Sequence, residues 1–275
     1  MVNCKSSHAI RFKSRLDTLL ILLLLSSISN KRDRMLMLSM WFRSKETPTL
    51  PVPQECSSTQ WDAEVVLETD ENPVQNGWYI ARAASSAVGA KLQIRASFSG
   101  YGRPEKSTVI KSVCLDSSQP YFLVIVDTGG DGISSDDTTA SWKLNLNGET
   151  LKSGGIDSYH KLVYFGVPET CSPGNKMFLL LLRTDDFPNE TSWVIRKADG
   201  SVLQKNPSSF TESQTLTLTQ RCLPEGLNLV FEISDSNQNG LCCDYGMGFF
   251  GAYIGGQEIL TGDVFGASKR VSFST

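Results

Sequence analysis

Histidine is almost missing from this 275-residue chain, which contains only His8 and His160. Two histidines are too few to make a catalytic triad built on histidine, or a zinc site with several histidine ligands, a reasonable expectation. Adjacent carboxylates such as Asp70-Glu71 are present, but neighbouring residues on a strand point to opposite faces, so we do not expect them to cooperate. We expect no catalytic residues, and we interpret His160 as a surface residue of a strand.

Positive charge is scarce after residue 55. Residues 56–275 contain 17 Lys and Arg against 25 Asp and Glu, which gives a net charge of −8. Nucleic acids and anionic lipids are bound through clustered positive charge. We therefore expect no nucleic acid among the partners of this part of the chain.

Long apolar runs are absent as well, since none reaches the roughly 20 residues that a membrane-spanning helix needs. The run Leu19–Leu25 follows basic residues and precedes Ser27 and Ser29, which is typical of a secretory signal over residues 1–29. An uncleaved signal anchor, which would tether the protein to a membrane, and a start at a later methionine are the alternatives. Residues 30–55 are basic and then proline-rich, as in a stiff linker. We expect a secreted or cell-surface protein.

An internal duplication is the most informative feature that the sequence does have. Thr69–Ile80 matches Thr184–Ile195 at an offset of 115 residues, and Cys114–Phe165 matches Cys222–Phe273 at an offset of 108 residues. Self-similarity of this kind defines the structural unit before any secondary structure is assigned. The duplication therefore predicts two copies of one module.

We define module 1 as residues 56–168 and module 2 as residues 169–275. Short runs rich in Val, Ile, Leu, Thr and aromatic residues alternate with turn signals such as Asn147-Gly148, and no segment beyond the N-terminus keeps a helical period. The predicted fold class is all-β. Each module is expected to be an antiparallel, jelly-roll-like β-sandwich of about seven or eight strands, large enough to bury its own core.

An even number of cysteines follows the signal segment, which indicates disulfide bonds in a secreted chain. They are Cys56, Cys114, Cys171, Cys222, Cys242 and Cys243. The duplication makes Cys56–Cys114 equivalent to Cys171–Cys222, and module 1 offers Cys56 no other partner. In module 2, a bond between the adjacent Cys242 and Cys243 competes with the crossing pairs Cys171–Cys242 and Cys222–Cys243.

The loop Asp235–Leu241 carries oxygen side chains at alternate positions before a glycine, a spacing typical of calcium loops, and its copy Asp127–Ile133 has Asp127 and Asp131 at the outer two of these positions, with Asp136 and Asp137 close behind. Position 12 after Asp235 is Gly246 rather than a bidentate Glu, which argues against a helix-flanked EF-hand. A turn whose Asp and Asn side chains bond their own backbone is the alternative. The candidate calcium ligands are Asp127, Asp131, Asp136, Asp137, Asp235, Asn237, Asn239 and Asp244.

Three aromatic residues after the second loop, Tyr245, Phe249 and Phe250, lie among glycines. They are the candidates for an exposed ligand-binding platform, with packing against the loop as the alternative. Asn189-Glu190-Thr191 is an N-glycosylation sequon, which in a secreted chain predicts that Asn189 lies on the surface.

Module 2 also contains the strings Pro188-Asn-Glu-Thr-Ser-Trp193, Cys222-Leu-Pro224, and Asp235-Ser followed by Gly240-Leu-Cys-Cys243. These strings resemble the P-x-E-T-S-W and D-S-x-G-D-G-I-C-C motifs of a repeat module in extracellular proteins of marine microalgae and bacteria. Asn237-Gln-Asn239 departs from the usual Gly-Asp, and module 1 has Ser134-Ser135 in place of the two cysteines. Such modules occur as non-catalytic appendages or tandem arrays, so the resemblance implies binding without naming a ligand.

From these observations we expect a secreted or surface-tethered pair of non-catalytic binding modules. The expected partner is an extracellular glycan or protein, and calcium is the expected cofactor that supports the loops. The alternative is a structural or adhesive surface protein, in which the modules are spacers without a specific ligand.

Overall fold

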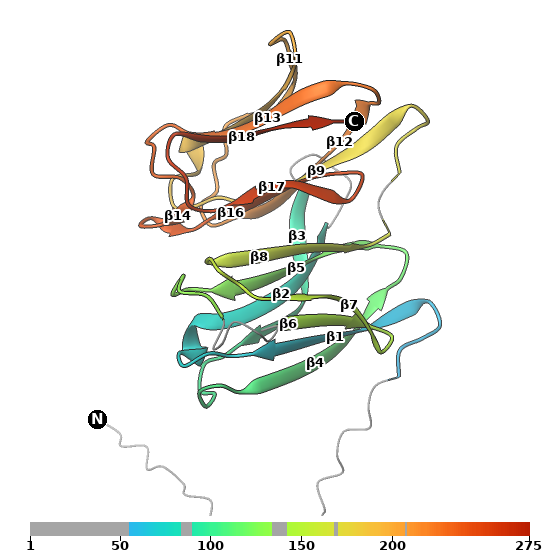
Figure 1. The fold of residues 1–275 in the computed structure, drawn as a ribbon, viewed down its shortest axis with the longest axis vertical. Coiled ribbons are helices and arrows are strands. Elements are labelled where there is room, and N and C mark those ends of the chain that lie inside the picture. Colours follow the sequence, from blue (N-terminus) through green and yellow to red (C-terminus); the bar gives the residue numbers. More distant parts are fainter. Residues whose placement is uncertain (1–54, 84–89, 134–141, 168–169, 207) are drawn as a thin grey trace, which may run out of the picture. The chain divides into compact units, whose positions relative to one another are not determined.

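The computed structural model describes residues 55–83, 90–133, 142–167, 170–206 and 208–275 (Figure 1). Residues 55–275 form one compact unit. The predicted signal segment and nearly all of the predicted linker, residues 1–54, lie outside the described residues. Within the described part of the chain, no helix has the length and apolar character needed to cross a membrane.

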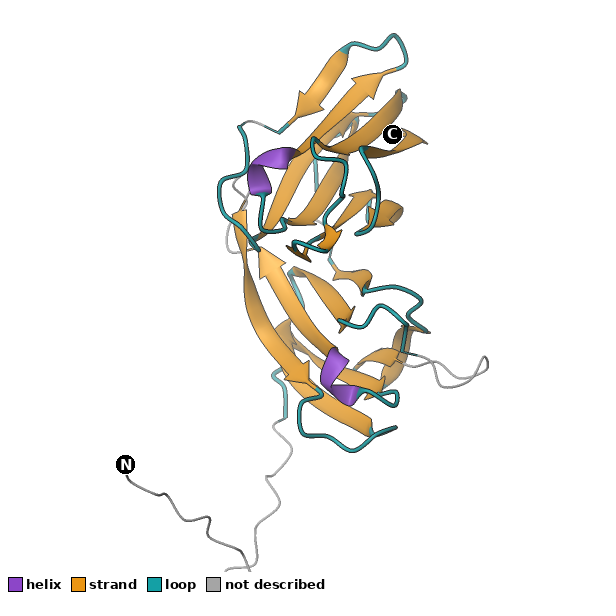
Figure 2. Ribbon diagram, turned by 90° about the vertical axis from the view of Figure 1, so that its left-hand side faces the viewer, coloured by secondary structure: helices purple, strands orange, loops and turns teal. Residues whose placement is uncertain are grey.

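The described residues fold almost entirely into antiparallel strands, which confirms the predicted all-β class (Figure 2). The strands described in module 1 are β1 (Gln60–Glu68), β2 (Asn76–Ala83), β3 (Ala90–Ser99), β4 (Thr108–Asp116), β5 (Pro120–Asp127), β6 (Trp142–Leu146), β7 (Glu149–Gly154) and β8 (His160–Gly166). Those described in module 2 are β9 (Asn175–Arg183), β10 (Thr191–Lys197), β11 (Val202–Lys205), β12 (Leu216–Pro224), β13 (Asn228–Asp235), β14 (Cys242–Cys243), β15 (Gly246–Met247), β16 (Phe249–Ile254), β17 (Gln257–Gly262) and β18 (Ser268–Ser274). Two short 3₁₀ helices, η1 (Pro73–Gln75) and η2 (Pro188–Glu190), precede β2 and β10.

The duplication in the sequence is repeated in the order of the strands. Module 1 has the strand orders β4-β1-β6-β7 and β3-β2-β5-β8, and module 2 has β12-β9-β16-β17 and β11-β10-β13-β18. The sequence offsets place β1 on β9 and β5 on β13, and β3, which lies where the offset changes, holds the same position in its layer as β11. Each module is therefore a sandwich of two four-stranded layers.

Each sandwich encloses its own hydrophobic core. Trp78 on β2 and Leu123 on β5 are at most 2% exposed in the core of module 1. Trp193 and Phe231 are equivalent to them by the duplication, and they are buried to the same degree in module 2. The positions that both copies keep apolar thus build both cores.

A third core lies between the modules, and the duplication did not predict it. Its side chains come from β5 and β8 of module 1 and from β9, β12 and β16 of module 2. They are Phe122, Val124, Leu162, Tyr164, Leu179, Leu181, Leu218, Phe249 and Tyr253. On β5 they alternate with Leu123 and its neighbours in the module 1 core, because successive side chains of a strand point to opposite faces. The four layers of strands therefore enclose three cores (Figure 1).

Main-chain hydrogen bonding also joins the modules. Strands β3 and β12 pair with Lys91 opposite Thr217 and Ala90 opposite Leu218, which fuses two layers into one eight-stranded sheet. Lys91 Nζ also lies 2.7 Å from Glu212 Oε2, but this ion pair is exposed and contributes little to stability. Because the modules share a sheet and a core, the stability of each module depends on its contacts with the other as well as on its own core.

All three cysteine pairs in the described residues are bonded. Cys56 is bonded to Cys114, with their Cα atoms 5.4 Å apart, and Cys171 is bonded to Cys222 at 5.7 Å. Cys242 is bonded to Cys243, so the crossing pairs with Cys171 and Cys222 are not formed. The Cys56–Cys114 bond closes a sequence separation of 58 residues. A loop of that length corresponds to about 4 kcal/mol of stabilisation in the chain-entropy model.

The shared core predicts a large effect of a substitution between the modules. Leu181 is completely buried there, so Leu181→Ala should lower the free energy of unfolding by about 2–5 kcal/mol. Leu151→Ala is the control, because Leu151 is 46% exposed and its substitution should change stability by less than about 0.5 kcal/mol. Urea unfolding of residues 55–275 measures both. Equal effects of the two substitutions would show that the third core does not stabilise the protein.

Candidate functional site

The candidate site of module 1 is built around Asp127, the last residue of β5, which is completely buried. Its Oδ1 accepts a hydrogen bond from the Gly129 amide at 3.0 Å, and its Oδ2 accepts one from the Gly132 amide at 2.7 Å. One carboxylate thus closes the loop that follows the strand, as side chains of Asp do in Asx turns.

Gly132 and its counterpart Gly240 are required by this loop. Their φ angles are +89° and +76°, a region that residues with a side chain rarely adopt. A Cβ on Gly132 would also collide with the carbonyl oxygen of Ile156, and one on Gly240 with that of Phe265. The glycine in the calcium-loop pattern therefore has a structural reason in both copies.

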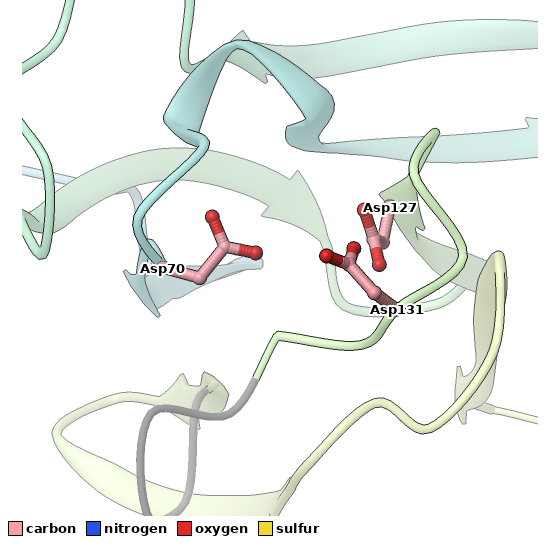
Figure 3. A group of neighbouring side chains, drawn as sticks. All are labelled: Asp70, Asp127 and Asp131. Atoms are coloured by element: carbon pink, nitrogen blue, oxygen red, sulfur yellow. The ribbon is translucent and has the colours of Figure 1, made fainter.

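Asp70 joins Asp127 and Asp131 from the chain that follows β1 (Figure 3). Oxygen atoms of the three carboxylates lie within 4.8 Å of one another, and no other group of three such residues in the described part of the chain meets this limit. Asp70 is held in place because its Oδ1 accepts from the Asn72 amide at 2.6 Å and its Oδ2 from Asn76 Nδ2 at 3.2 Å. The sequence analysis did not predict Asp70 as a ligand, although the Thr-Asp pair to which it belongs is present in both copies.

Burial raises the pKa of Asp127 above its ordinary value. The hydrogen bonds from Gly129 and Gly132 oppose this rise, whereas the charges of Asp131 and Asp70 add to it. A positive ion among these oxygens would favour the ionised carboxylate and so oppose the rise in its pKa. The arrangement therefore suits a cation bound by oxygen ligands, such as calcium.

Module 2 has an equivalent group on β13 and the loop before η2. Asp235 and Asp185 are both 2% exposed, and they match Asp127 and Asp70. Asp235 Oδ1 accepts from the Asn239 amide at 3.2 Å, and Asp185 Oδ1 accepts from the Phe187 amide at 2.9 Å. Burial raises the pKa of Asp185, the Phe187 amide opposes the rise, and the charge of Asp235 adds to it.

Glu190, the last residue of η2, brings a third carboxylate to this group. Loss of hydration raises its pKa, and the charges of Asp235 and Asp185 raise it further. Its Oε1 accepts a hydrogen bond from Asn237 Nδ2. The sequence analysis did not predict Asp185 or Glu190 as ligands, because both lie far in sequence from the calcium-loop pattern.

The remaining predicted ligands have different outcomes. Asp136 and Asp137 lie outside the described residues. Asn237 is exposed and donates its side-chain amide to Glu190 Oε1, and its role as a ligand stays a prediction. Asp244 is exposed and belongs to no close group of three carboxylates among the described residues.

The predicted aromatic platform is wrong for Phe249 and Phe250, which are at most 1% exposed. They are successive residues of β16, so Phe249 fills the core between the modules and Phe250 the core of module 2. Tyr245 is 51% exposed, and its ring lies edge-on to that of Phe187 at 5.3 Å between centroids. Phe187, which is 42% exposed, was missed. An exposed aromatic pair therefore lies beside the acidic group of module 2.

The predicted sequon, Asn189-Glu190-Thr191, covers the end of η2 and the start of β10. Asn189 is exposed on η2, whereas Thr191 is 1% exposed and begins β10. The Asn189 side chain is therefore on the surface in the folded chain.

His160 is not the surface residue that the sequence analysis predicted, because its side chain is only 2% exposed. It lies at the boundary of the modules, where its Nδ1 is 3.4 Å from Asp263 Oδ2 and its ring is 4.5 Å from that of Phe249. Ser158 donates to the same Asp263 oxygen at 2.9 Å. The three residues do not have the geometry of a triad, because the serine bonds the carboxylate and His160 Nε2 has no hydrogen-bond partner among the described residues.

Comparisons with protein-family models, with curated proteins and with solved structures each found no match to this chain. The function therefore has to be inferred from the residues of the site.

The raised pKa of Asp185 predicts how its substitution depends on pH. The ionised carboxylate is disfavoured in the folded chain, so its cost is absent below the ordinary pKa of 3.8 and grows as the pH rises above it. In a chelating buffer, Asp185→Asn should match the parent at pH 3.5 and become progressively more stable than it toward neutral pH. Thermal unfolding across this range measures the difference.

Asp199→Asn is the matched control with the opposite sign. Hydrogen bonds from the Ser201 hydroxyl and amide hold the pKa of Asp199 below its ordinary value. Its ionised form is therefore favoured in the folded chain, and the Asn variant should lose stability relative to the parent as the pH rises. A flat or falling difference for Asp185→Asn would contradict the proposed electrostatic cost at this position.

Proposed function

We propose that this chain is a secreted or surface-tethered, non-catalytic binding protein that recognises an extracellular glycan or protein, with calcium supporting its loops. The exposed pair of Phe187 and Tyr245 beside the acidic group of module 2 carries this proposal. Large exposed aromatic side chains are enriched at binding surfaces, because they offer apolar area at a low entropic cost.

Hydrogen bonds hold the backbone at both residues of the aromatic pair. The Asp186 amide donates to the Tyr245 carbonyl oxygen at 2.8 Å, and the Phe187 amide donates to Asp185 at 2.9 Å. Gln214 Nε2 also donates to Asp186 Oδ1 at 2.9 Å, which keeps polar groups close to the rings. A rigid aromatic surface bordered by amides and carboxylates suits a sugar, whose C–H face packs on a ring while its hydroxyls form hydrogen bonds.

Calcium support is inferred from Asp70, Asp127 and Asp131, whose oxygens lie within 4.8 Å of one another. Calcium binds oxygen ligands that include several carboxylates. Burial raises the pKa of Asp127, the charges of Asp131 and Asp70 add to this rise, and a bound cation would oppose it. Since Asp127 closes its own loop, an ion at this point would stiffen the loop.

The compartment and the lack of catalysis are inferred from other features. Three disulfide bonds fit an oxidising environment such as the cell exterior. The net charge of −8 over residues 56–275 disfavours nucleic acid. Ser158, His160 and Asp263 lack the geometry of a hydrolase, so binding is the function that the described residues support best.

Residues 55–275 should bind a subset of an extracellular glycan array, and either Phe187→Ala or Tyr245→Ala should weaken that binding about 10-fold or more. Neither substitution should shift the melting temperature, because both rings are substantially exposed. Tyr101→Ala is the control, since Tyr101 is 82% exposed in module 1 and its loss should leave binding unchanged.

Three outcomes of the array experiment decide between the candidate functions. Loss of binding in Phe187→Ala and Tyr245→Ala, but not in Tyr101→Ala, supports a glycan site at the aromatic pair. Binding that survives both substitutions would place the ligand elsewhere. A parent protein that binds no glycan and captures no extracellular protein would favour the structural or adhesive alternative.

A further inference from the structure

The duplication aligns four oxygen-bearing positions of the two acidic groups. Two of them are Asp in both copies, namely Asp70 with Asp185 and Asp127 with Asp235. At the other two, an acid and an amide have changed places. Gln75 of module 1 corresponds to Glu190 of module 2, and Asp131 of module 1 corresponds to Asn239 of module 2.

This exchange keeps the chemistry of the group constant. Each module has three carboxylates and one side-chain amide at the four positions, although the residues at two positions differ. Loss of the carboxylate at one position is compensated by a carboxylate at another. A turn stabilised only by local hydrogen bonds has no need for such compensation, whereas a cation site depends on its number of charged ligands.

Unpartnered oxygen atoms provide independent support in module 2. Asp235 is 2% exposed, and its Oδ2 has no hydrogen-bond partner among the described residues. The same is true of the buried atoms Glu190 Oε2 and Asn239 Oδ1, and of Gln75 Oε1 in module 1. A buried oxygen without a donor is costly, and these four atoms are all acceptors, which a positive ion satisfies and another acceptor does not. The Thr191 hydroxyl beside Glu190 is also without a partner among the described residues.

The main-chain pairing explains why the residues of this group are neighbours. Thr191, next to Glu190, is opposite Asp235 in the β10–β13 pair, and the Ser236 amide donates to the Glu190 carbonyl oxygen at 3.1 Å. Asn237 fixes the Glu190 side chain by donating to its Oε1, which leaves Oε2 directed elsewhere. The 3₁₀ helix η2 and the loop after β13 thus form the two sides of one site.

We propose that module 2 binds a divalent cation, of which calcium fits an all-oxygen set best, through Asp185, Glu190, Asp235 and Asn239. The proposal rests on the proposed calcium support of the loops and adds a second ion with its own ligand set. A group of three carboxylates whose oxygens all lie within 4.8 Å of one another is present in module 1 but not in module 2 among the described residues, so the module 2 site should bind calcium more weakly.

Calorimetric titration of the full-length chain with calcium tests the site by stoichiometry. The parent should bind two ions, and Asp235→Asn should bind one, while its Oδ1 still accepts from the Asn239 amide. Asp127→Asn should lose the other ion. Glu232→Gln removes one charge from the same strand outside the site and should keep both ions. Two ions bound by Asp235→Asn would overturn the proposal.

A reciprocal exchange tests the ligand set without removing a buried residue. Glu190→Gln should weaken the module 2 site at least about 10-fold, because one charged ligand is lost. Adding Asn239→Asp recreates the residues of module 1 and should restore the affinity to within about threefold of the parent. A double variant no better than Glu190→Gln would overturn the assignment of these ligands, whatever the folding of Asp235→Asn.

The outcomes separate this inference from the proposed function. A chain that binds a single ion, which is lost in Asp127→Asn, would refute the module 2 site and leave the calcium support of module 1 intact. A chain that binds no calcium would refute both. Glycan binding through Phe187 and Tyr245 is measured separately, in the presence and absence of a chelator.

Discussion

Burial of a carboxylate at the end of a central strand is the constraint on which both loops depend. Asp127 ends β5 and Asp235 ends β13, and each is at most 2% exposed. A carboxylate in that position is stable only if its oxygens find donors or a cation. The Asp127 carboxylate accepts from two backbone amides of its loop, whereas the Asp235 carboxylate has the Asn239 amide as its one donor among the described residues. The same constraint thus closes the loop in module 1 and leaves an acceptor free in module 2.

The fold within each module could be predicted because its signals are local, whereas the core between the modules needed a comparison of the two copies. Strand β5 is apolar without interruption from Tyr121 to Val126, and β9 from Met177 to Leu182. Their counterparts, β13 and β1, are interrupted by charged residues such as Glu232 and Glu64, and buried and partly exposed positions alternate along most of each strand. A continuous apolar run indicates burial on both faces, and alternation indicates burial on one. The difference between the copies therefore marks the faces that pack together.

Only some residues of the two acidic groups could be predicted from the sequence. Asp127 and Asp235 follow from the spacing of the loop, but Asp70 and Glu190 approach them because β2 pairs with β5 and β10 with β13. Such proximity depends on register across the sheet, which no local pattern contains. Phe249 was misjudged for a related reason, since glycine neighbours indicate backbone freedom and say nothing of which face of β16 is covered.

The outer layers of the two modules carry charge at positions that are apolar in the shared core. Module 1 contributes β5 and β8 to the shared core and module 2 contributes β9 and β16, so the contact joins different faces of equivalent modules. A contact of this kind would add further copies if the remaining faces were also apolar. Glu64 on β1 takes the place that Leu179 holds on β9, and Glu232 on β13 takes that of Val124 on β5. Charge at these positions makes the outer faces of β1 and β13 unsuited to an apolar contact of the same kind, as on the polar faces of capping repeats.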